Sequence, residues 1–285
     1  DRCLFWRKII RENKKEINMN SRYVLATIEP KIDTLPNTAF SAKDILFDWT
    51  AFQVPKGTCA IRSINVITQG TDAVAANGDQ DVSLYFAKSI NGVAPPTLGA
   101  TNSAIAIINA AAVRRHIIAH QFLDATEMED KNDPLIGYNV LGSGTHNTAN
   151  LQSNRHDAII EGDTFFSGDA NHSKTVEGFQ TIWVAGVAIG AHNFGTACLI
   201  DGAVTDLTTR TFDVSENTDA DDVFAVGDEL IACAANGSSV QVIGTVTAVT
   251  ADTITTDGVG FDGALADDDE VCFRRPITLR LGLQY

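Results

Sequence analysis

Residues 223–273 read VFAVGDELIACAANGSSVQVIGTVTAVTADTITTDGVGFDGALADDDEVCF, and this stretch predicts a small closed β unit. Asn236-Gly237 and Asp257-Gly258 are strong hairpin signals, because both central positions of a tight type I′ turn need a positive φ. We therefore expect a β meander that closes into a barrel. Val-Gly-Asp at 226–228 opens the first candidate strand. The next candidate strands, which contain β-branched residues, are 240–249, 253–256 and 270–273.

Apolar strands are expected on both sides of this unit, TIWVAGVAIG at 181–190 and PITLRLGLQ at 276–284. Sequential strands tend to be neighbours, so the second of these should return to the sheet that contains the first. The expected fold is all-β. It is an antiparallel, jelly-roll-like β-sandwich formed by 20–196 and completed by 276–285, with a small acidic barrel at 197–275 inserted before the last strand.

Short candidate strands also alternate with turn residues through the first part of the chain, as in antiparallel sandwiches. The segment 101–125 is ambiguous, because its alanines favour a helix and its β-branched residues favour a short helix followed by a strand at 114–121. Residues 126–158 are polar and rich in Gly and Asn, which predicts a long functional or subunit-contacting loop. The remaining candidate strands are 23–29, 44–49, 59–68, 81–88, 158–162 and 164–166.

Charge is unevenly distributed along the chain, whose formal net charge is −15. Residues 1–19 carry a balance of +3. Residues 201–275 carry −13, with 16 acidic side chains against Arg210, Arg274 and Arg275. A strongly acidic body repels nucleic acid and anionic membranes, so we expect neither as a partner. No apolar run reaches the roughly 20 residues that a membrane-spanning helix needs.

The segment DRCLFWRKIIRENKKEIN at 1–18 differs in composition from the rest of the chain. Codons for the Lys-Lys-Glu at 14–16 can form a purine-rich ribosome-binding sequence, so translation is expected to start at Met19. The alternative is that 1–19 forms a basic arm that docks on a partner. The apolar run at 3–6 is too short for a signal peptide.

The cysteines lack Cys-x-x-Cys spacing, which predicts buried reduced thiols rather than a disulfide framework or a zinc site. They are Cys3, Cys59, Cys198, Cys233 and Cys272. His116 and His120 would share one face of a helix and could chelate a metal. However, Ile117 stands where a zincin needs Glu, and Arg114 and Arg115 would repel a cation. No metal site is expected there.

Other candidate catalytic and ion-binding groups also lack the spacing of known motifs. A Ser/His/Asp set has no Gly-x-Ser-x-Gly elbow, and Gly142-Ser143-Gly144-Thr145 lacks the Gly-Lys-Ser/Thr of a phosphate loop. Two acidic clusters do not fit a spaced Ca²⁺ loop, so a solvated acidic rim is expected. We expect no catalytic residue and no cofactor. The residues concerned are His146, His156, His172, His192, Ser143, Ser153 and Asp157, and the acids Glu216, Asp219, Asp221, Asp222, Asp267, Asp268, Asp269 and Glu270.

One family resemblance stands out. The segment YVLATIEPKIDTLPNTAFSAKDILFDWTAFQVPKGTCAIRSINVIT at 23–68, followed by DVSLYFAK at 81–88, resembles the opening of virion structural proteins of tailed phages, particularly marine ones. The stretch VGDELIACAANGSSVQVIGTVTAVTADTITTDG at 226–258 is similar to small barrels of phage head and tail proteins. The resemblance covers most of 20–285. It implies a capsid decoration or cement protein, or another virion component, with no enzymatic residues to carry over.

The expected role is therefore non-enzymatic stabilisation of the capsid surface after assembly in the host cytoplasm. Its partners would be the major capsid protein and copies of the chain itself, most simply as a homotrimer. The alternative is a tail- or fibre-associated module that binds host carbohydrate through Trp49, Trp183 or Tyr138, although apolar strand positions favour core packing for both tryptophans. A polysaccharide-degrading enzyme would need two carboxylates about 5–10 Å apart across a groove.

Overall fold

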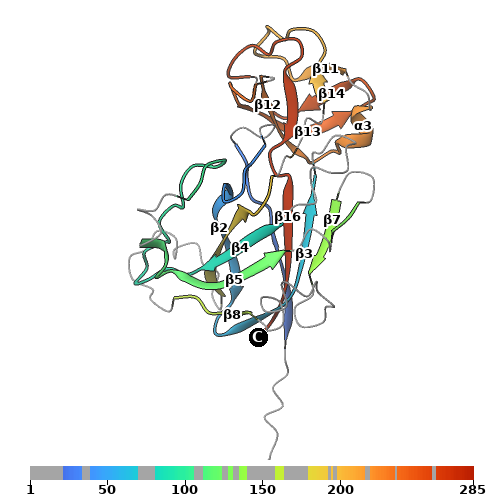
Figure 1. Cartoon of the computed structure of the whole chain (residues 1–285). Coiled ribbons are helices and arrows are strands. Elements are labelled where there is room, and N and C mark those ends of the chain that lie inside the picture. Colours follow the sequence, from blue (N-terminus) through green and yellow to red (C-terminus); the bar gives the residue numbers. More distant parts are fainter. Residues whose placement is uncertain are drawn as a thin grey trace, which may run out of the picture.

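In the computed structural model of the 285-residue chain, the regular secondary structure consists almost entirely of antiparallel strands (Figure 1). Two open sheets and one closed barrel account for these strands. The structure describes residues 22–33, 39–69, 81–105, 112–123, 128–130, 135–139, 158–163, 179–191, 194, 198–215, 219–234, 236–258 and 261–285.

The two open sheets have the nested strand order of a jelly roll. One runs β1-β16-β3-β7-β6, with β8 also paired to β3, and the other runs β2-β9-β4-β5. The pairs β1–β16, β2–β9, β3–β7 and β4–β5 are all antiparallel, as in one long hairpin rolled into two facing sheets. The strands are β1 (Tyr23–Ile28), β2 (Ile45–Pro55), β3 (Cys59–Thr68), β4 (Val82–Ala87), β5 (Ile117–Leu123), β6 (Met128–Asp130), β7 (Leu135–Asn139), β8 (Ala158–Ile160), β9 (Phe179–Ala188) and β16 (Ile277–Gln284).

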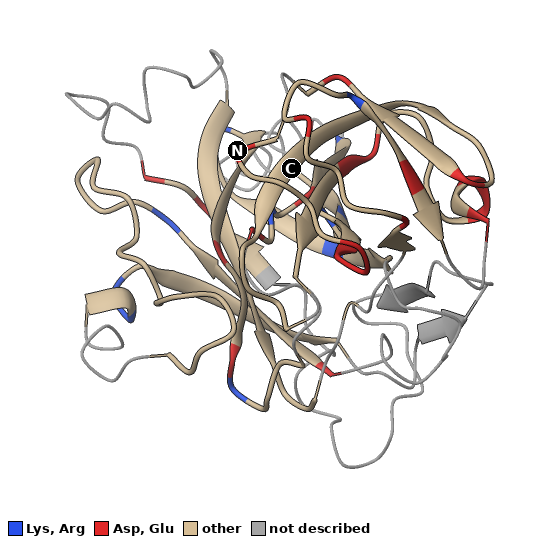
Figure 2. Cartoon of the chain, turned by 90° about the horizontal axis from the view of Figure 1, so that it is seen from above, with Lys and Arg blue, Asp and Glu red and all other residues tan. Residues whose placement is uncertain are grey.

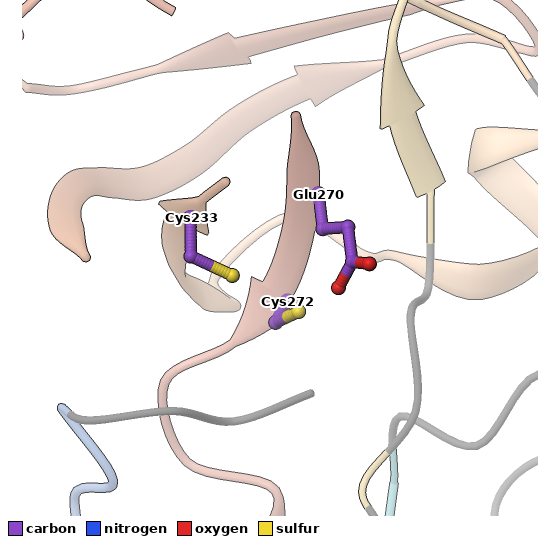
Figure 3. Close-up of side chains that lie close together, drawn as sticks. All are labelled: Cys233, Glu270 and Cys272. Carbon is purple, nitrogen blue, oxygen red and sulfur yellow. The ribbon is translucent and has the colours of Figure 1, made fainter. Parts of the chain in front are cut away.

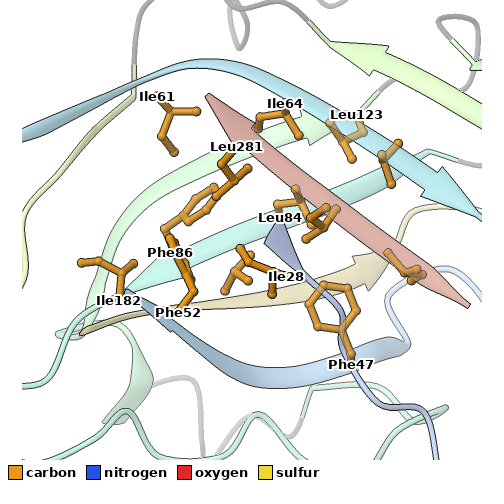
Figure 4. Close-up of a cluster of buried hydrophobic side chains, with 14 of the residues drawn as sticks. Ile28, Phe47, Phe52, Ile61, Ile64, Leu84, Phe86, Leu123, Ile182 and Leu281 are labelled. Atoms are coloured by element: carbon orange, nitrogen blue, oxygen red, sulfur yellow. The ribbon is translucent and has the colours of Figure 1, made fainter. Parts of the chain in front are cut away.

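One hydrophobic core fills the space between the sheets, because alternate side chains of each strand point inward. Phe52 and Phe86 meet edge to face, with ring centroids 6.4 Å apart. Full burial of each such side chain stabilises the fold by about 1.5–3 kcal/mol. Figure 4 shows Phe47, Phe52, Leu84, Phe86, Leu123 and Ile182 of one sheet against Ile28, Ile61, Ile64 and Leu281 of the other.

Strand β9 is buried on both faces after its first residue. One face contributes to the core between the sheets, and the other packs with Leu98 and Val113 from the segment that follows β4. Double burial explains why its sequence is a continuous apolar run rather than an alternation. A side chain at Gly186 would overlap the ring of Phe47, so close packing of that ring needs glycine here.

Six strands close a separate barrel in the order β10-β11-β14-β13-β12-β15, with β15 returning to β10. Its interior holds its own apolar cluster, which includes Phe212, Phe224 and Phe273. The chain enters the barrel after β9 and leaves it before β16, so the predicted all-β fold with a barrel inserted before the last strand is confirmed. The barrel strands are β10 (Cys198–Ile200), β11 (Thr211–Ser215), β12 (Glu229–Cys233), β13 (Gln241–Val249), β14 (Thr253–Thr256) and β15 (Glu270–Phe273), and a short helix, α3 (Ala220–Val223), precedes β12.

The barrel is not the simple meander that the turn signals predicted. Asn236 and Gly237 do lie in the β12–β13 connection. The hairpin predicted at Asp257-Gly258 is wrong, because β14 pairs with β13 and β11 whereas β15 pairs with β12 and β10. Asp257 instead supports β13, where its Oδ1 accepts a hydrogen bond of 2.6 Å from the N–H of Thr245. The Asp257-Gly258 sequence therefore provides a side-chain hydrogen bond and not a hairpin turn.

Elsewhere the structure sharpens the expected boundaries. Strand β2 extends to Pro55, well past the predicted 44–49. Of the two alternatives for 101–125, the strand is confirmed as β5, which begins at Ile117. The predicted loop 126–158 contains β6 and β7, because β7 pairs with β3. Residues 140–157 and the candidate strand 164–166 lie outside the described residues.

Candidate functional site

The barrel and the jelly roll meet where β15 continues into β16. Arg274 and Arg275 occupy this connection. The N–H of Arg274 donates to the carbonyl of Glu229 at the start of β12, at 2.8 Å. The carbonyl of Arg274 accepts from the N–H of Ile32, beyond the end of β1, also at 2.8 Å. The backbone of one residue therefore bonds to both parts of the molecule.

Ion pairs reinforce this junction. Arg274 holds Asp33 with two hydrogen bonds, Nε to Oδ1 at 2.5 Å and Nη2 to Oδ2 at 3.0 Å, and its Nη1 donates to Glu229 Oε1. Arg275 Nε lies 2.7 Å from Glu229 Oε2, and its Nη1 donates to Glu29 Oε2 at 3.2 Å. Two parallel hydrogen bonds, as between Arg274 and Asp33, are a strong arrangement for an arginine–carboxylate pair. Acids of the jelly roll and of the barrel thus share the same two arginines.

The electrostatics of the junction favour the ionised forms of Asp33 and Glu229. Burial of Glu229 opposes ionisation, yet hydrogen bonds from Lys31 (3.1 Å) and Arg274, with the nearby charge of Arg275, hold its pKa below the ordinary value. The hydrogen bond from Arg274 likewise lowers the pKa of Asp33, against a smaller opposing effect of burial. A carboxylate held ionised by fixed cations is suited to binding rather than to proton donation. The junction is therefore a latch between the two parts.

A cleft of about 260 Å³ opens beside this latch, between the barrel and the jelly roll. Three carboxylates line it, from Glu29, Asp228 and Glu229. The first and last are ion-paired with arginine or lysine. Burial raises the pKa of Asp228, although its Oδ2 accepts a hydrogen bond of 2.8 Å from the N–H of Ala225. One acid with a raised pKa beside two carboxylates that are ion-paired with cations is a weak basis for glycoside hydrolysis.

A second polar cluster lies on the outer face of the barrel. Cys233 on β12 and Glu270 and Cys272 on β15 place their sulfur and carboxylate oxygen atoms within 4.8 Å of one another (Figure 3). Among the described residues, these side chains form the group able to hold a metal ion. The described cysteines are thiols, and all are buried, in agreement with the sequence. Sequence spacing gave no sign that two of them converge.

The two histidines that a helix would have placed on one face, His116 and His120, lie apart in the structure. His116 precedes β5 and His120 lies within it, so the chain between them is largely extended and not helical. Residues four apart in a strand are separated by about 13 Å. His116 is buried, with Nδ1 2.8 Å from the carbonyl oxygen of Lys88, whereas the ring of His120 packs on Tyr85. Both rings therefore have structural contacts.

The described members of the acidic clusters serve loops and surface. Asp267 Oδ1 accepts from the N–H of Gly202 at 2.8 Å, and Asp269 Oδ2 accepts from the N–H of Ala266 at 2.7 Å. The remaining described acids, except Glu270, are exposed. Figure 2 shows acidic residues distributed over several loops of the chain. The remaining candidate residues lie outside the described residues: Glu216, His172, His192 and those between 142 and 157.

The aromatic residues considered for sugar binding are used differently. Trp183 is buried in β9, as expected. Trp49 is partly buried, and its Nε1 donates to the carbonyl of Pro96 at 2.9 Å. Tyr138 lies on β7, where it pairs with Asn65 of β3. Burial of Trp183 leaves it no open face for stacking.

No protein family model matches this chain, and no curated protein matches it significantly. None of the described helices is long and apolar enough to cross a membrane. The architecture and the surface of the molecule are therefore the features that bear on its function.

Proposed function

We propose that this chain is a non-enzymatic structural protein of a tailed-phage virion, which decorates the capsid and stabilises the shell through contacts between subunits. The observation that carries the proposal is a jelly roll with an apolar edge strand. Jelly rolls are a recurrent architecture of viral capsid proteins. Among the described strands, β1 pairs with β16 alone, so its other side forms a sheet edge. Exposed edges of this kind favour pairing with another chain.

The apolar side chains on this edge define a surface, here called the β1 surface, made by Tyr23 and Leu25. Tyr23 is 69% exposed and Leu25 is 62% exposed. Their β16 partners in the register, Gln284 and Gly282, add no large apolar side chain to this face. Adjacent apolar side chains on a sheet edge are unfavourable in water and favourable in an interface. The proposed occupants are the major capsid protein and further copies of this chain, in a closed trimer.

The acidic barrel supports the same arrangement. The barrel lies at one end of the molecule, and the end of β16 lies at the other (Figure 1). Residues 201–275 carry a balance of −13, and charge of one sign keeps exposed surfaces in solution. If the β1 surface binds the shell, the barrel points away from it. The protein would then stabilise the shell by mass action, since it binds the assembled lattice and not its dissociated subunits.

A matched pair of variants tests this role. Tyr23→Ser/Leu25→Ser should fold normally but lose co-sedimentation with undecorated particles of the phage. Leu207→Ser, on the barrel and 42% exposed, should bind like the wild type. Mass spectrometry of purified particles should count this protein at hundreds of copies. Equal binding by both variants would remove the β1 surface from the proposal.

Heat release of packaged DNA separates this role from host recognition. Particles without the protein should assemble, yet release DNA at a lower temperature. If the release temperature is unchanged and adsorption to cells is lost, the carbohydrate-binding alternative replaces the decoration role. Hydrolysis of host polysaccharide by the purified chain, lost in Asp228→Asn, would instead make it an enzyme.

A further inference from the structure

The outer face of the barrel carries three side chains able to bind a metal. They lie there because side chains along β12 and β15 alternate between the inside and the outside of the barrel. On β12 and β15, Leu230, Ala232, Val271 and Phe273 point into the barrel. The intervening residues therefore point outward, and Cys233 and Cys272 are nevertheless 1% and 2% exposed. Cys233 is directly opposite Glu270 in the register. Glu270 and Cys272 are two apart on β15, so all three side chains emerge on the same face (Figure 3).

We propose that Cys233, Glu270 and Cys272 bind a thiophilic divalent cation, with Zn²⁺ as the best match. Thiolate and carboxylate are both zinc ligands, and thiolate sulfur selects against Ca²⁺ and Mg²⁺. In a tetrahedral zinc site, neighbouring S and O ligands are about 3.6–3.8 Å apart. The three ligand atoms lie within 4.8 Å of one another, so small side-chain rotations bring them to this spacing. Three protein ligands leave a fourth position for water or another donor.

The register argues against the obvious alternative, a disulfide between the two thiols. Cys272 is opposite Ile231, and Cys233 is opposite Glu270, so the cysteines are diagonal neighbours. Diagonal Cα atoms in an antiparallel pair are about 7–8 Å apart, beyond the usual reach of a disulfide. A cation can bridge that diagonal, because it adds two bonds of about 2.3 Å between the sulfur atoms. It would also interact favourably with the negative charge of Glu270, a partly buried residue whose Oε2 atom is buried.

Another described cysteine provides an internal contrast. Cys59 lies in the jelly-roll core, where its Sγ donates to the carbonyl of Pro55 at 3.4 Å and burial raises the pKa of the thiol. It is not part of the Cys233 group, and its pKa disfavours the thiolate that a metal needs. Cys59→Ala is therefore the control variant. The proposed site joins β12 to β15, which are the strands that lead into the junction, so metal should stabilise the barrel in particular.

Cobalt titration of the reduced, chelator-treated full chain tests the site. One equivalent of Co²⁺ should produce a thiolate-to-cobalt charge-transfer band, and Zn²⁺ should abolish it. Cys233→Ala and Cys272→Ala should lose the band, and Cys59→Ala should keep it. Glu270→Gln should keep a thiolate band but bind at least about tenfold more weakly, as even outer-shell changes can do. Absence of the band at one equivalent, or its persistence in both cysteine variants, would overturn the proposal.

A second measurement needs no variant and therefore holds if a substitution prevents folding. Zn²⁺ should protect the wild-type Cys233 and Cys272 from alkylation, identified by peptide mass, while the reactivity of Cys59 stays unchanged. Equal modification of all three with and without Zn²⁺ would contradict the site. Recovery of a Cys233–Cys272 disulfide from the native protein would also contradict it.

Discussion

The jelly roll and the barrel both bury their strands, but they differ in how far apart the paired strands lie along the chain. In the jelly roll, β1 pairs with β16, so the earliest described strand depends on the latest. The barrel closes entirely within 198–273 and has its own core. Shorter loops cost less entropy to close, so the barrel can form before the jelly roll is complete. An insertion is tolerated here because the inserted part closes on itself.

Core substitutions, one in each part of the molecule, should have the largest effect on stability. Phe86→Ala in the jelly roll and Phe224→Ala in the barrel each empty a fully buried site, at a cost of about 3–5 kcal/mol. We expect two calorimetric transitions, with each variant lowering one of them. Tryptophan and tyrosine fluorescence gives the assignment, since 197–275 contains neither residue. A single transition lowered equally by both variants would mean that the molecule unfolds as one unit.

Arg274→Gln should have a smaller effect, on the coupling between the two parts. The side chains of Arg274 and Glu229 are each 17% exposed, and that of Asp33 is 48% exposed, so we expect a loss of about 1–2 kcal/mol. The two transitions should move further apart in temperature. Arg280→Gln, on the exposed face of β16, is the matched control and should change neither transition. Equal shifts in both variants would make the junction incidental.

Acid should weaken the latch in a defined direction. The folded-state pKa values of Asp33 and Glu229 lie below their ordinary values of 3.8 and 4.5. Their contribution is therefore complete above pH 4.5 and is lost as pH falls through the folded values. The raised pKa of Asp228 acts in the opposite sense, because its folded state gains stability on protonation. The stability difference between wild type and Arg274→Gln should thus shrink below pH 4.5, and a pH-independent difference would refute this effect.

Local patterns predicted much of the fold, whereas contacts between distant strands escaped them. The strand 59–68 and the strands of the barrel from 240 onward show β-branched runs between turn residues, which is information carried by neighbours in sequence. Asp257-Gly258 misled because its turn propensity was used for a hydrogen bond to β13. β10 is short, with three residues, and was missed.

The candidate site was harder to predict, because strand register creates it. Glu229 and Asp33 meet at Arg274 only once β1, β12 and β15 are assembled. The absence of Cys-x-x-Cys argued against a zinc site, but that spacing describes ligands on one turn, not on paired strands. One signal was present: in Glu270-Val271-Cys272-Phe273, the apolar residues alternate with two potential ligands. Its partner Cys233 could not be assigned without the register.

The position of β16 has a consequence for how copies of the chain find one another. It lies between β1 and β3, although the ribosome makes it after every other described strand. Until it arrives, β1 and β3 flank an unfilled slot in which a matching strand would find both sets of backbone partners. A neighbouring copy carries that strand with the same register. Exchange of β16 between crowded nascent chains would therefore give an interlocked pair, whereas a barrel that closes first would bring the two ends of the insertion together and shorten this interval.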